Sequence, residues 1–204
     1  MRLLANLSAL TLAAVSCNPP TGGAQDNRTA EDMPGTIVGA SAQGELAPPP
    51  EADQAVTYGP ELAPPGATLR IESQSSAAGT HIEFFAEGLM PDRGYAAHAH
   101  TEPCGTDPSD PGPRFQDERD PSVAEGEDST DPDYGNPENE IWLDFTTDGD
   151  GDAERIVQVP VGLVEHAPRS IVLHEAEETA TAPGEAGQAG ERVACLTISY
   201  ERNP

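Results

Sequence analysis

Glycine and proline divide this chain of 204 residues into short segments in which apolar and polar residues alternate. Its 20 Gly and 21 Pro favour turns and disfavour long helices. Successive side chains of a strand point to opposite faces, so a short alternating segment is typical of a strand with one buried face. Candidate strands occur at residues 55–58, 67–73, 81–85, 95–100, 141–147, 155–159, 170–174 and 194–200, and the alternation is clearest at 67–73 and 141–147. Short strands with this spacing predict an all-β fold, an antiparallel sandwich or barrel, without helices.

Two long segments interrupt this series of strands. Residues 105–139 are rich in Asp, Pro and Glu, and residues 175–191 are rich in Ala, Glu, Gly and Thr. Loops of this length within a domain are usually either functional or disordered. Each loop begins shortly after a segment that contains candidate metal-binding histidines. We therefore expect the two loops to lie together at one side of the domain.

The first 17 residues have the features of an export signal. Arg2 is the only charged residue before residue 26, and a short apolar stretch with small residues near its end leads to Cys17. This end resembles the cleavage box of bacterial lipoproteins, in which the cysteine becomes the lipidated first residue, although Ala14 stands where Leu is usual. The alternative is ordinary signal cleavage near this point. Both alternatives predict an exported protein, either a cell-envelope lipoprotein anchored through Cys17 or a secreted protein.

The segment that follows has a different composition from the rest of the chain. Residues 18–44 contain Pro, Gly and scattered charges without hydrophobic periodicity, which predicts a flexible tether. Residues 45–204 contain the candidate strands and are predicted to form one folded domain.

The charge of the chain excludes some classes of partner. Its ten basic residues are all Arg, against 36 acidic residues, and the formal net charge is −26. Such acidity argues against binding to nucleic acid or to an anionic membrane surface. A membrane contact is expected only through lipid on Cys17. The sequence leaves the oligomeric state open.

The chain contains three cysteines, an odd number for an exported protein. If Cys17 carries lipid, Cys104 and Cys195 remain as a pair. An oxidising compartment would let this pair form a disulfide.

Two histidines one residue apart point to a metal site. On a strand, His98 and His100 would lie on the same face, while Ala97 and Ala99 would turn into the core. A third histidine from elsewhere would complete a site of three nitrogens, which suits copper or zinc. The alternative is a pair of histidines on a solvated strand.

Other candidate ligands have simpler interpretations. His81 and His166 are expected to be structural or surface residues. Asp148, Asp150 and Asp152 resemble the start of a calcium loop, but Ala153 replaces the glycine that such a loop needs. An acidic hairpin turn is the favoured interpretation of this segment.

Several segments also occur in the order found in a known family. They are residues 95–100, 104–105, 112–116, 139–145, 172–175 and 189–195. Over residues 45–204 the chain resembles the Cu/Zn superoxide dismutases, most closely their exported bacterial members. This resemblance implies a Greek-key β-barrel or sandwich with two long loops, copper as cofactor and superoxide as small-molecule substrate.

The resemblance also implies roles for individual residues. Copper would be bound by His98, His100 and His174. Arg192 would act in catalysis by drawing superoxide to the copper. The disulfide of the family would join Cys104 and Cys195.

One position departs from the family pattern. Arg114 stands where the family has the histidine that bridges copper and zinc, and a guanidinium has no lone pair to donate to a metal. No histidine lies between His100 and His166, so the zinc ligands are missing and zinc is not expected. Arg114 would stand close to the metal unless it turns toward the acidic loop.

These observations predict a copper-dependent superoxide dismutase of the cell envelope, which converts superoxide to dioxygen and hydrogen peroxide. Two alternatives on the same fold are a non-catalytic copper-binding domain and a metal-free structural domain.

Overall fold

The computed structural model describes residues 37–202, apart from residues 53, 77, 164 and 165. Strands and loops make up this part of the chain, and it contains no helix. The strands are β1 (Ile37–Glu45), β2 (Ala55–Thr57), β3 (Thr68–Ser76), β4 (Gly79–Glu87), β5 (Gly94–Tyr95), β6 (Ala97–His100), β7 (Phe145–Thr146), β8 (Ala153–Val159), β9 (Ser170–His174), β10 (Arg192–Thr197) and β11 (Glu201–Arg202). The prediction of an all-β fold is confirmed.

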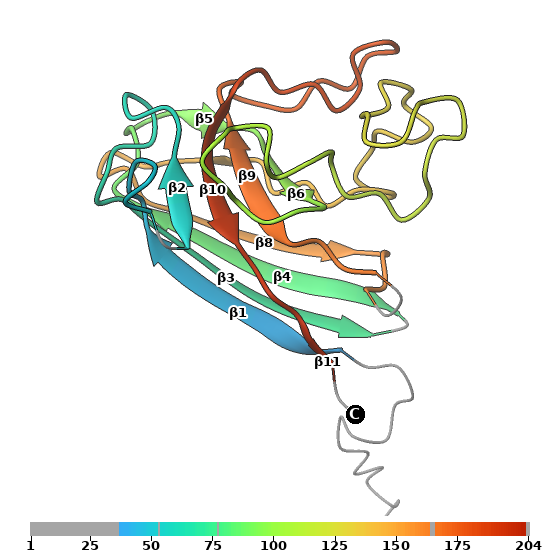
Figure 1. Cartoon of the computed structure of the whole chain (residues 1–204), viewed down its shortest axis with the longest axis horizontal. Coiled ribbons are helices and arrows are strands. Elements are labelled where there is room, and N and C mark those ends of the chain that lie inside the picture. Colours follow the sequence, from blue (N-terminus) through green and yellow to red (C-terminus); the bar gives the residue numbers. More distant parts are fainter. Residues whose placement is uncertain (1–36, 53, 77, 164–165, 203–204) are drawn as a thin grey trace, which may run out of the picture.

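The strands form two main antiparallel sheets that lie one above the other (Figure 1). One sheet has the strand order β11-β1-β3-β4-β8, and the other has the order β2-β10-β9-β6. β5 and β7 pair separately as a small two-stranded sheet. Within the described residues the sheets stay separate and do not close into a barrel. Of the two predicted architectures, the structure therefore has the sandwich.

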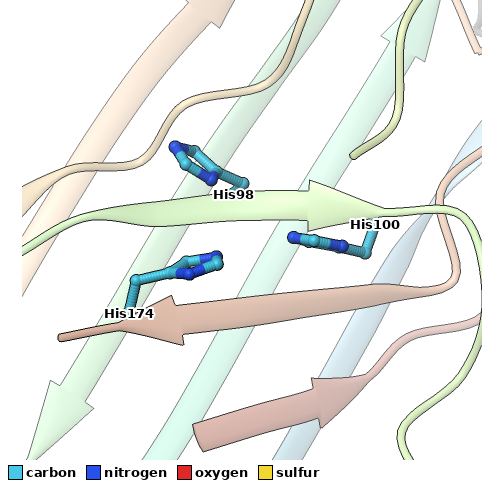
Figure 2. Close-up of side chains that lie close together, drawn as sticks. All are labelled: His98, His100 and His174. Atoms are coloured by element: carbon cyan, nitrogen blue, oxygen red, sulfur yellow. The ribbon is translucent and has the colours of Figure 1, made fainter. Parts of the chain in front are cut away.

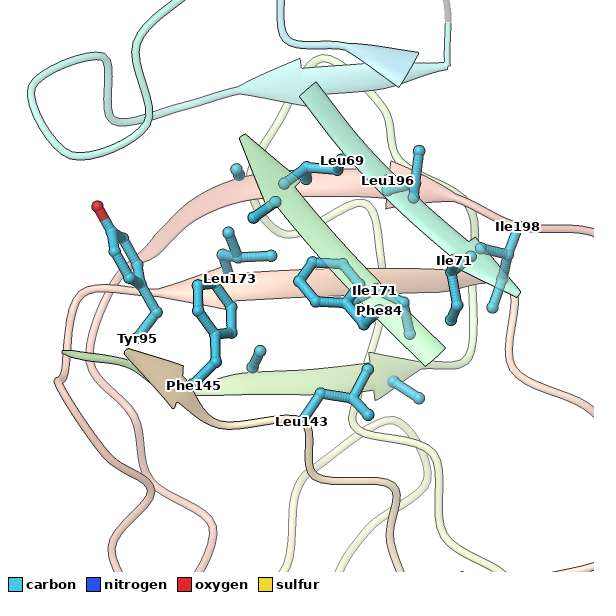
Figure 3. Packing of buried hydrophobic residues seen from close by; sticks show 14 of the residues in the cluster. Leu69, Ile71, Phe84, Tyr95, Leu143, Phe145, Ile171, Leu173, Leu196 and Ile198 are labelled. Atoms are coloured by element: carbon cyan, nitrogen blue, oxygen red, sulfur yellow. The ribbon is translucent and has the colours of Figure 1, made fainter. Parts of the chain in front are cut away.

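The hydrophobic core fills the space between the sheets, as the alternation in the sequence predicts. In β4, Ile82, Phe84 and Ala86 are buried, while Glu83 and Phe85, which alternate with them, are partly exposed. The ring of Phe145 packs 5.5 Å from that of Phe84 and 5.3 Å from that of Tyr95, measured between centroids (Figure 3). Full burial of a side chain of this size contributes about 1.5–3 kcal/mol.

The two strands that carry the candidate metal site are buried on both faces. Every residue of β6 and β9 is buried. Ala97 and Ala99 belong to the core cluster, as does Leu173 of β9. Because side chains alternate, His98 and His100 point to the opposite face of the sheet, away from the core. Other parts of the chain must cover that face.

The segment at residues 141–147 is strand only in part. Phe145–Thr146 forms β7, whereas Trp142 makes an isolated bridge with His98. The backbone nitrogen of Leu143 donates to the oxygen of Ala97 at 2.8 Å. This segment therefore runs along the edge of β6, and the ring of Trp142 lies 5.7 Å from that of His98.

Both long segments, 105–139 and 175–191, lack named strands, as predicted. They lie together at one end of the sandwich, in yellow-green and in red-orange (Figure 1). The backbone nitrogen of Gly184 in the second loop donates to the oxygen of Thr130 in the first at 3.0 Å. The expectation that the two loops meet is confirmed.

The folded domain begins earlier than predicted. Residues 37–45 form β1, which pairs with β3, so the prediction of a flexible tether for residues 18–44 is wrong over residues 37–44. This strand uses small side chains: Ala40 and Ala42 are buried, and a Cβ on Gly44 would lie 2.6 Å from the Cβ of Ala55. Alanine and glycine give only a weak hydrophobic pattern, so the sequence did not predict this strand.

The predicted signal segment 1–17, with Cys17, lies outside the described residues, as does the tether up to residue 36. Among the residues that are described, none belongs to a helix with the length and apolar character needed to cross a membrane.

Candidate metal centre

The structure brings three histidines together on the face of the second sheet that points away from the core. His98 and His100 lie on β6, and His174 ends the neighbouring strand β9 (Figure 2). One ring nitrogen of each lies within 4.8 Å of those of the other two. All three side chains are buried, with exposed fractions of 1%, 1% and 6%.

Each histidine ring has two nitrogens, and a hydrogen bond at one of them leaves the other free. The Thr179 hydroxyl donates to Oδ1 of Asp144 at 2.8 Å, so it accepts from Nε2–H of His98 at 2.7 Å. Nδ1–H of His100 donates to the oxygen of Gly112 at 2.9 Å. Nδ1 of His174 faces the oxygen of Gly190 at 3.4 Å. These contacts leave a lone pair on Nδ1 of His98 and on Nε2 of the other two histidines.

These three remaining nitrogens are buried and have no hydrogen-bond partner. A buried polar atom without a partner costs free energy, so such atoms are rare unless something binds them. Three imidazole nitrogens that converge in this way are a suitable donor set for a transition metal ion. The residues present therefore fit a metal.

Electrostatics keeps the three rings neutral, which is the form that binds metal. Burial is the main cause that lowers the pKa of each ring, and neighbouring positive charge, including the guanidinium of Arg192, lowers it further. The pKa of His174 falls from 6.5 to about 4. The pKa values of His98 and His100 also lie well below the usual value. At neutral pH no proton competes for the site.

Arg192 lies beside these histidines. The pairing of β10 with β9 shifts register between Arg192 and Ala194, and this irregularity places Arg192 opposite His174. Its Nη2 donates to the oxygen of Gly112 at 2.7 Å, and its Nη1 donates to the oxygen of Pro108 at 2.9 Å. The Gly112 oxygen thus holds both His100 and Arg192.

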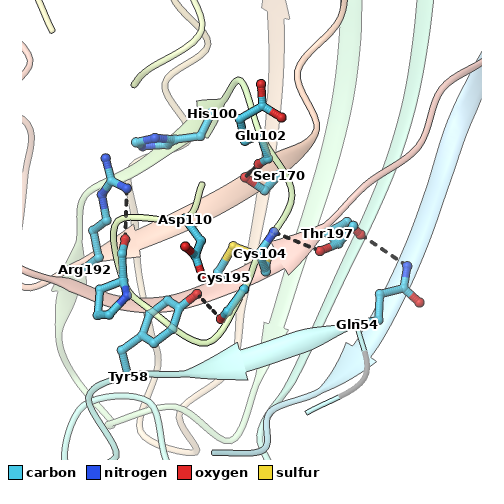
Figure 4. The surroundings of a disulfide bond; sticks show 12 residues. Gln54, Tyr58, His100, Glu102, Cys104, Asp110, Ser170, Arg192, Cys195 and Thr197 are labelled. Atoms are coloured by element: carbon cyan, nitrogen blue, oxygen red, sulfur yellow. Dashed lines mark hydrogen bonds between the residues drawn. A yellow bond between two sulfur atoms is a disulfide. The ribbon is translucent and has the colours of Figure 1, made fainter. Parts of the chain in front are cut away.

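The Cys104–Cys195 disulfide is present, as predicted, with a Cα–Cα distance of 5.8 Å (Figure 4). It ties the start of the first long loop to β10, three residues after Arg192. Tyr58 also binds this loop, because its hydroxyl donates to the oxygen of Gly105 at 2.9 Å. A disulfide of this kind indicates a non-reducing environment.

The Arg114 side chain pairs with acidic groups, although its positive charge still helps to lower the pKa of all three histidines. Its Nε donates to Oε2 of Glu140 at 2.8 Å, and its Nη2 donates to the oxygen of Ser129 at 2.6 Å. Of the two orientations that the sequence allowed, Arg114 takes the one toward acidic groups.

The remaining candidates lie apart from this centre. His81 pairs with Glu83 at 3.1 Å and is partly exposed, whereas His166 faces the oxygen of Gln116 at 3.2 Å. The Asp148 carboxylate accepts from the backbone nitrogens of Asp150 and Asp152. These bonds agree with a hairpin turn.

Sequence reasoning missed Asp144 and Thr179, which support His98. Asp144 could have been noticed, because the alternation at 141–147 puts it on the same face as Trp142, opposite the core residues Ile141 and Leu143. Thr179 carries no comparable signal, because it lies in an irregular loop.

No protein-family model matches the sequence, and no curated protein matches it.

Removal of the Thr179 hydroxyl should weaken metal binding. Thr179→Val leaves Nε2–H of His98 and the Asp144 carboxylate without their shared partner, so we expect a loss of about 10–100-fold in metal affinity. Binding can be followed by the fluorescence of Trp142, the single tryptophan, whose ring lies 5.7 Å from that of His98. Thr179→Ser should restore the affinity.

A matched control is Thr181→Val, which changes an exposed threonine of the same loop. Equal metal affinity in the Thr179→Val and Thr181→Val variants would contradict a role of Thr179 in orienting His98.

Proposed function

We propose that this chain is a copper-dependent superoxide dismutase. The observation that carries the proposal is the convergence of three unpartnered, buried imidazole nitrogens with a fixed guanidinium beside them. A donor set of imidazoles alone suits copper, which binds such sites more tightly than zinc does. The resemblance of residues 45–204 to the Cu/Zn superoxide dismutases supports copper and superoxide.

Each residue of the centre has a defined task in this proposal. His98, His100 and His174 would hold the ion. When bound, copper would supply one-electron chemistry between Cu(II) and Cu(I), by which one superoxide loses an electron to become dioxygen and the next gains that electron, with two protons from the solvent, to become hydrogen peroxide. The Gly112 oxygen orients His100, and Thr179 with Asp144 orients His98.

Arg192 is proposed to attract the substrate. A net charge of −26 repels an anion, so capture of superoxide needs a local positive charge. The Arg192 guanidinium is about half-buried and is held by two carbonyl oxygens, which keeps it at the site. An Arg is well suited to this task because it stays protonated.

For location, we propose the cell envelope. The disulfide agrees with an oxidising compartment, and the predicted signal with a lipid anchor at Cys17 supports export.

A second candidate function is copper binding without catalysis. The free nitrogens of the three histidines are buried from solvent. Arg114 stands where the Cu/Zn superoxide dismutases have a fourth nitrogen ligand, and its side chain is paired with Glu140. Three imidazoles without a fourth ligand suit Cu(I), which tolerates low coordination numbers.

Copper loading with a dismutation assay separates these functions. The purified protein is given copper, and bound metal and the rate of superoxide decay are measured together. We expect one copper per chain and rapid decay, with both lost in His98→Ala and retained in the control His81→Ala, which changes a histidine outside the centre. Bound copper without turnover would favour the second function. Absence of stoichiometric copper would leave a structural domain.

Loss of Arg192 should slow substrate capture. Arg192→Ala removes the attractive charge at the site, and electrostatic steering of this kind changes association rates by about tenfold or more. We expect kcat/KM to fall about tenfold at low ionic strength, with a smaller difference from the wild type at high salt, because salt screens the attraction.

The matched control is Arg155→Ala, which removes an exposed arginine of β8 and should leave the rate unchanged. If the Arg192 and Arg155 variants had the same rate at every salt concentration, the proposed steering would be refuted.

A further inference from the structure

A buried ion pair joins Arg114, within the first long loop, to Glu140, which directly follows that loop. The side chain of Arg114 is 6% exposed and that of Glu140 is 1% exposed, with 2.8 Å between Nε and Oε2. A buried ion pair is favourable only when its remaining donors and acceptors are also satisfied. The surroundings of this pair meet that condition.

The guanidinium uses all three of its nitrogens. Besides Glu140, it donates through Nη2 to the oxygen of Ser129 at 2.6 Å, and Nη1 lies 3.6 Å from Oδ2 of Asp128. The Glu140 carboxylate also accepts from Nε2 of Gln116 at 2.8 Å and from Nε1 of Trp142 at 2.7 Å. Arg114 and Glu140 therefore join the first loop to the segment that runs beside β6.

The second loop rests on the other side of the same guanidinium. Gly187 has a φ of +77°, and a Cβ at this position would lie 2.3 Å from Nη2 of Arg114. Only glycine allows so close an approach with this backbone conformation. The Arg114 guanidinium thus lies between the two loops.

The backbone around Arg114 connects this pair to the metal centre. The nitrogen of Phe115 donates to the oxygen of Ala99 at 2.9 Å, and Arg114 forms an isolated bridge with His100. Two residues before Arg114, the oxygen of Gly112 accepts from Nδ1–H of His100 and from Nη2 of Arg192. The position of the Gly112 carbonyl therefore depends on the backbone around Arg114, which the buried ion pair with Glu140 holds in place.

We propose that Arg114 is a positioning residue, which, through its ion pair with Glu140, fixes the Gly112 carbonyl and thereby sets the orientation of His100 and Arg192. In this arrangement the guanidinium of a first-loop residue is held by Glu140 and Ser129 and packs against Gly187 of the second loop. This inference uses the histidine site of the proposed function, but its first readout needs neither metal nor activity.

The test uses the double variant Arg114→Met/Glu140→Gln. It removes the ion pair without leaving a buried unpaired charge, and the glutamine oxygen can still accept from Trp142. In the metal-free protein, NMR measures the exchange of Nδ1–H of His100 with water. We expect exchange at least about tenfold faster than in the wild type, and a copper affinity about 10–100-fold lower. The Cu(II) EPR spectrum should change as well.

A control with the same change of charges is Arg119→Met/Glu118→Gln, which replaces exposed residues of the same loop. It should keep wild-type exchange and affinity. A folded double variant at positions 114 and 140 with wild-type exchange of Nδ1–H would overturn the proposal.

If that double variant does not fold, Arg114→Lys addresses the same question. It keeps a charge for Glu140, but a single ammonium group cannot also replace the fork that reaches Ser129. We expect exchange faster than in the wild type, and unchanged exchange would overturn the proposal. A wild-type protein that binds no copper would contradict the proposed function, while the exchange rates would still test the role of Arg114.

Discussion

Replacement of Cys104 and Cys195 by alanine is expected to lower the free energy of unfolding by about 4–5 kcal/mol. The disulfide joins residues 91 positions apart, and a cross-link that closes a loop of this length reduces the entropy of the unfolded chain by that amount in the chain-entropy model. Native proteins have a total stability of about 5–15 kcal/mol, so the loss is a large part of it. Denaturant unfolding of the wild type and the variant measures the difference.

Reduction provides the control for this prediction. A reductant should lower the stability of the wild type to that of the double alanine variant and leave the variant unchanged. A difference of less than about 1 kcal/mol would mean that the unfolded chain is already restricted in another way. Cys195 follows Arg192 by three residues on β10, so under the proposed function reduction should also slow the capture of superoxide.

Acidification of the metal-free protein is expected to produce the second largest effect. Burial lowers the pKa of His174 to about 4 in the folded state, while the unfolded chain has a value near 6.5. Between these values the unfolded state binds a proton that the folded state does not, so stability falls as the pH decreases from about 6.5 to about 4. At about 1.36 kcal/mol for each pH unit, His174 alone accounts for roughly 3 kcal/mol. His98 and His100 act in the same direction.

Unfolding free energies at pH 7 and pH 4 measure this effect against a variant. His174→Gln should lose roughly 3 kcal/mol less than the wild type over this interval, because glutamine does not titrate. The control His81→Gln, at a partly exposed histidine, should follow the wild type. Equal losses in all three proteins would contradict the assignment of the effect to the buried histidine.

The sequence alone was sufficient for the class of fold. Alternation at residues 67–73 and 81–85 predicted the strands that the structure contains as β3 and β4, because each of them buries one face. Where the buried side chains are small, as at Ala40 and Ala42 of β1, the pattern was too weak, and the strand was assigned to the tether. At residues 141–147 the alternation was real, but only Phe145–Thr146 pairs as a strand.

Part of the candidate site also followed from the sequence. The spacing of His98 and His100 placed them on one face of a strand, and their rings share that face in the structure. His174, Arg192 and the Cys104–Cys195 pair came from the resemblance to a family, and the structure brings all of them to the same region.

Only the tertiary structure decided how these residues are oriented. The free nitrogen of His98 depends on Thr179, 81 residues away, and Arg192 is held by Gly112, 80 residues away. The direction of Arg114 depends on Glu140 and on the close approach of Gly187. Local patterns in a sequence report which face of a strand is buried, because that depends on neighbouring residues. Contacts between distant segments depend on how the whole chain packs, and no local pattern contains them.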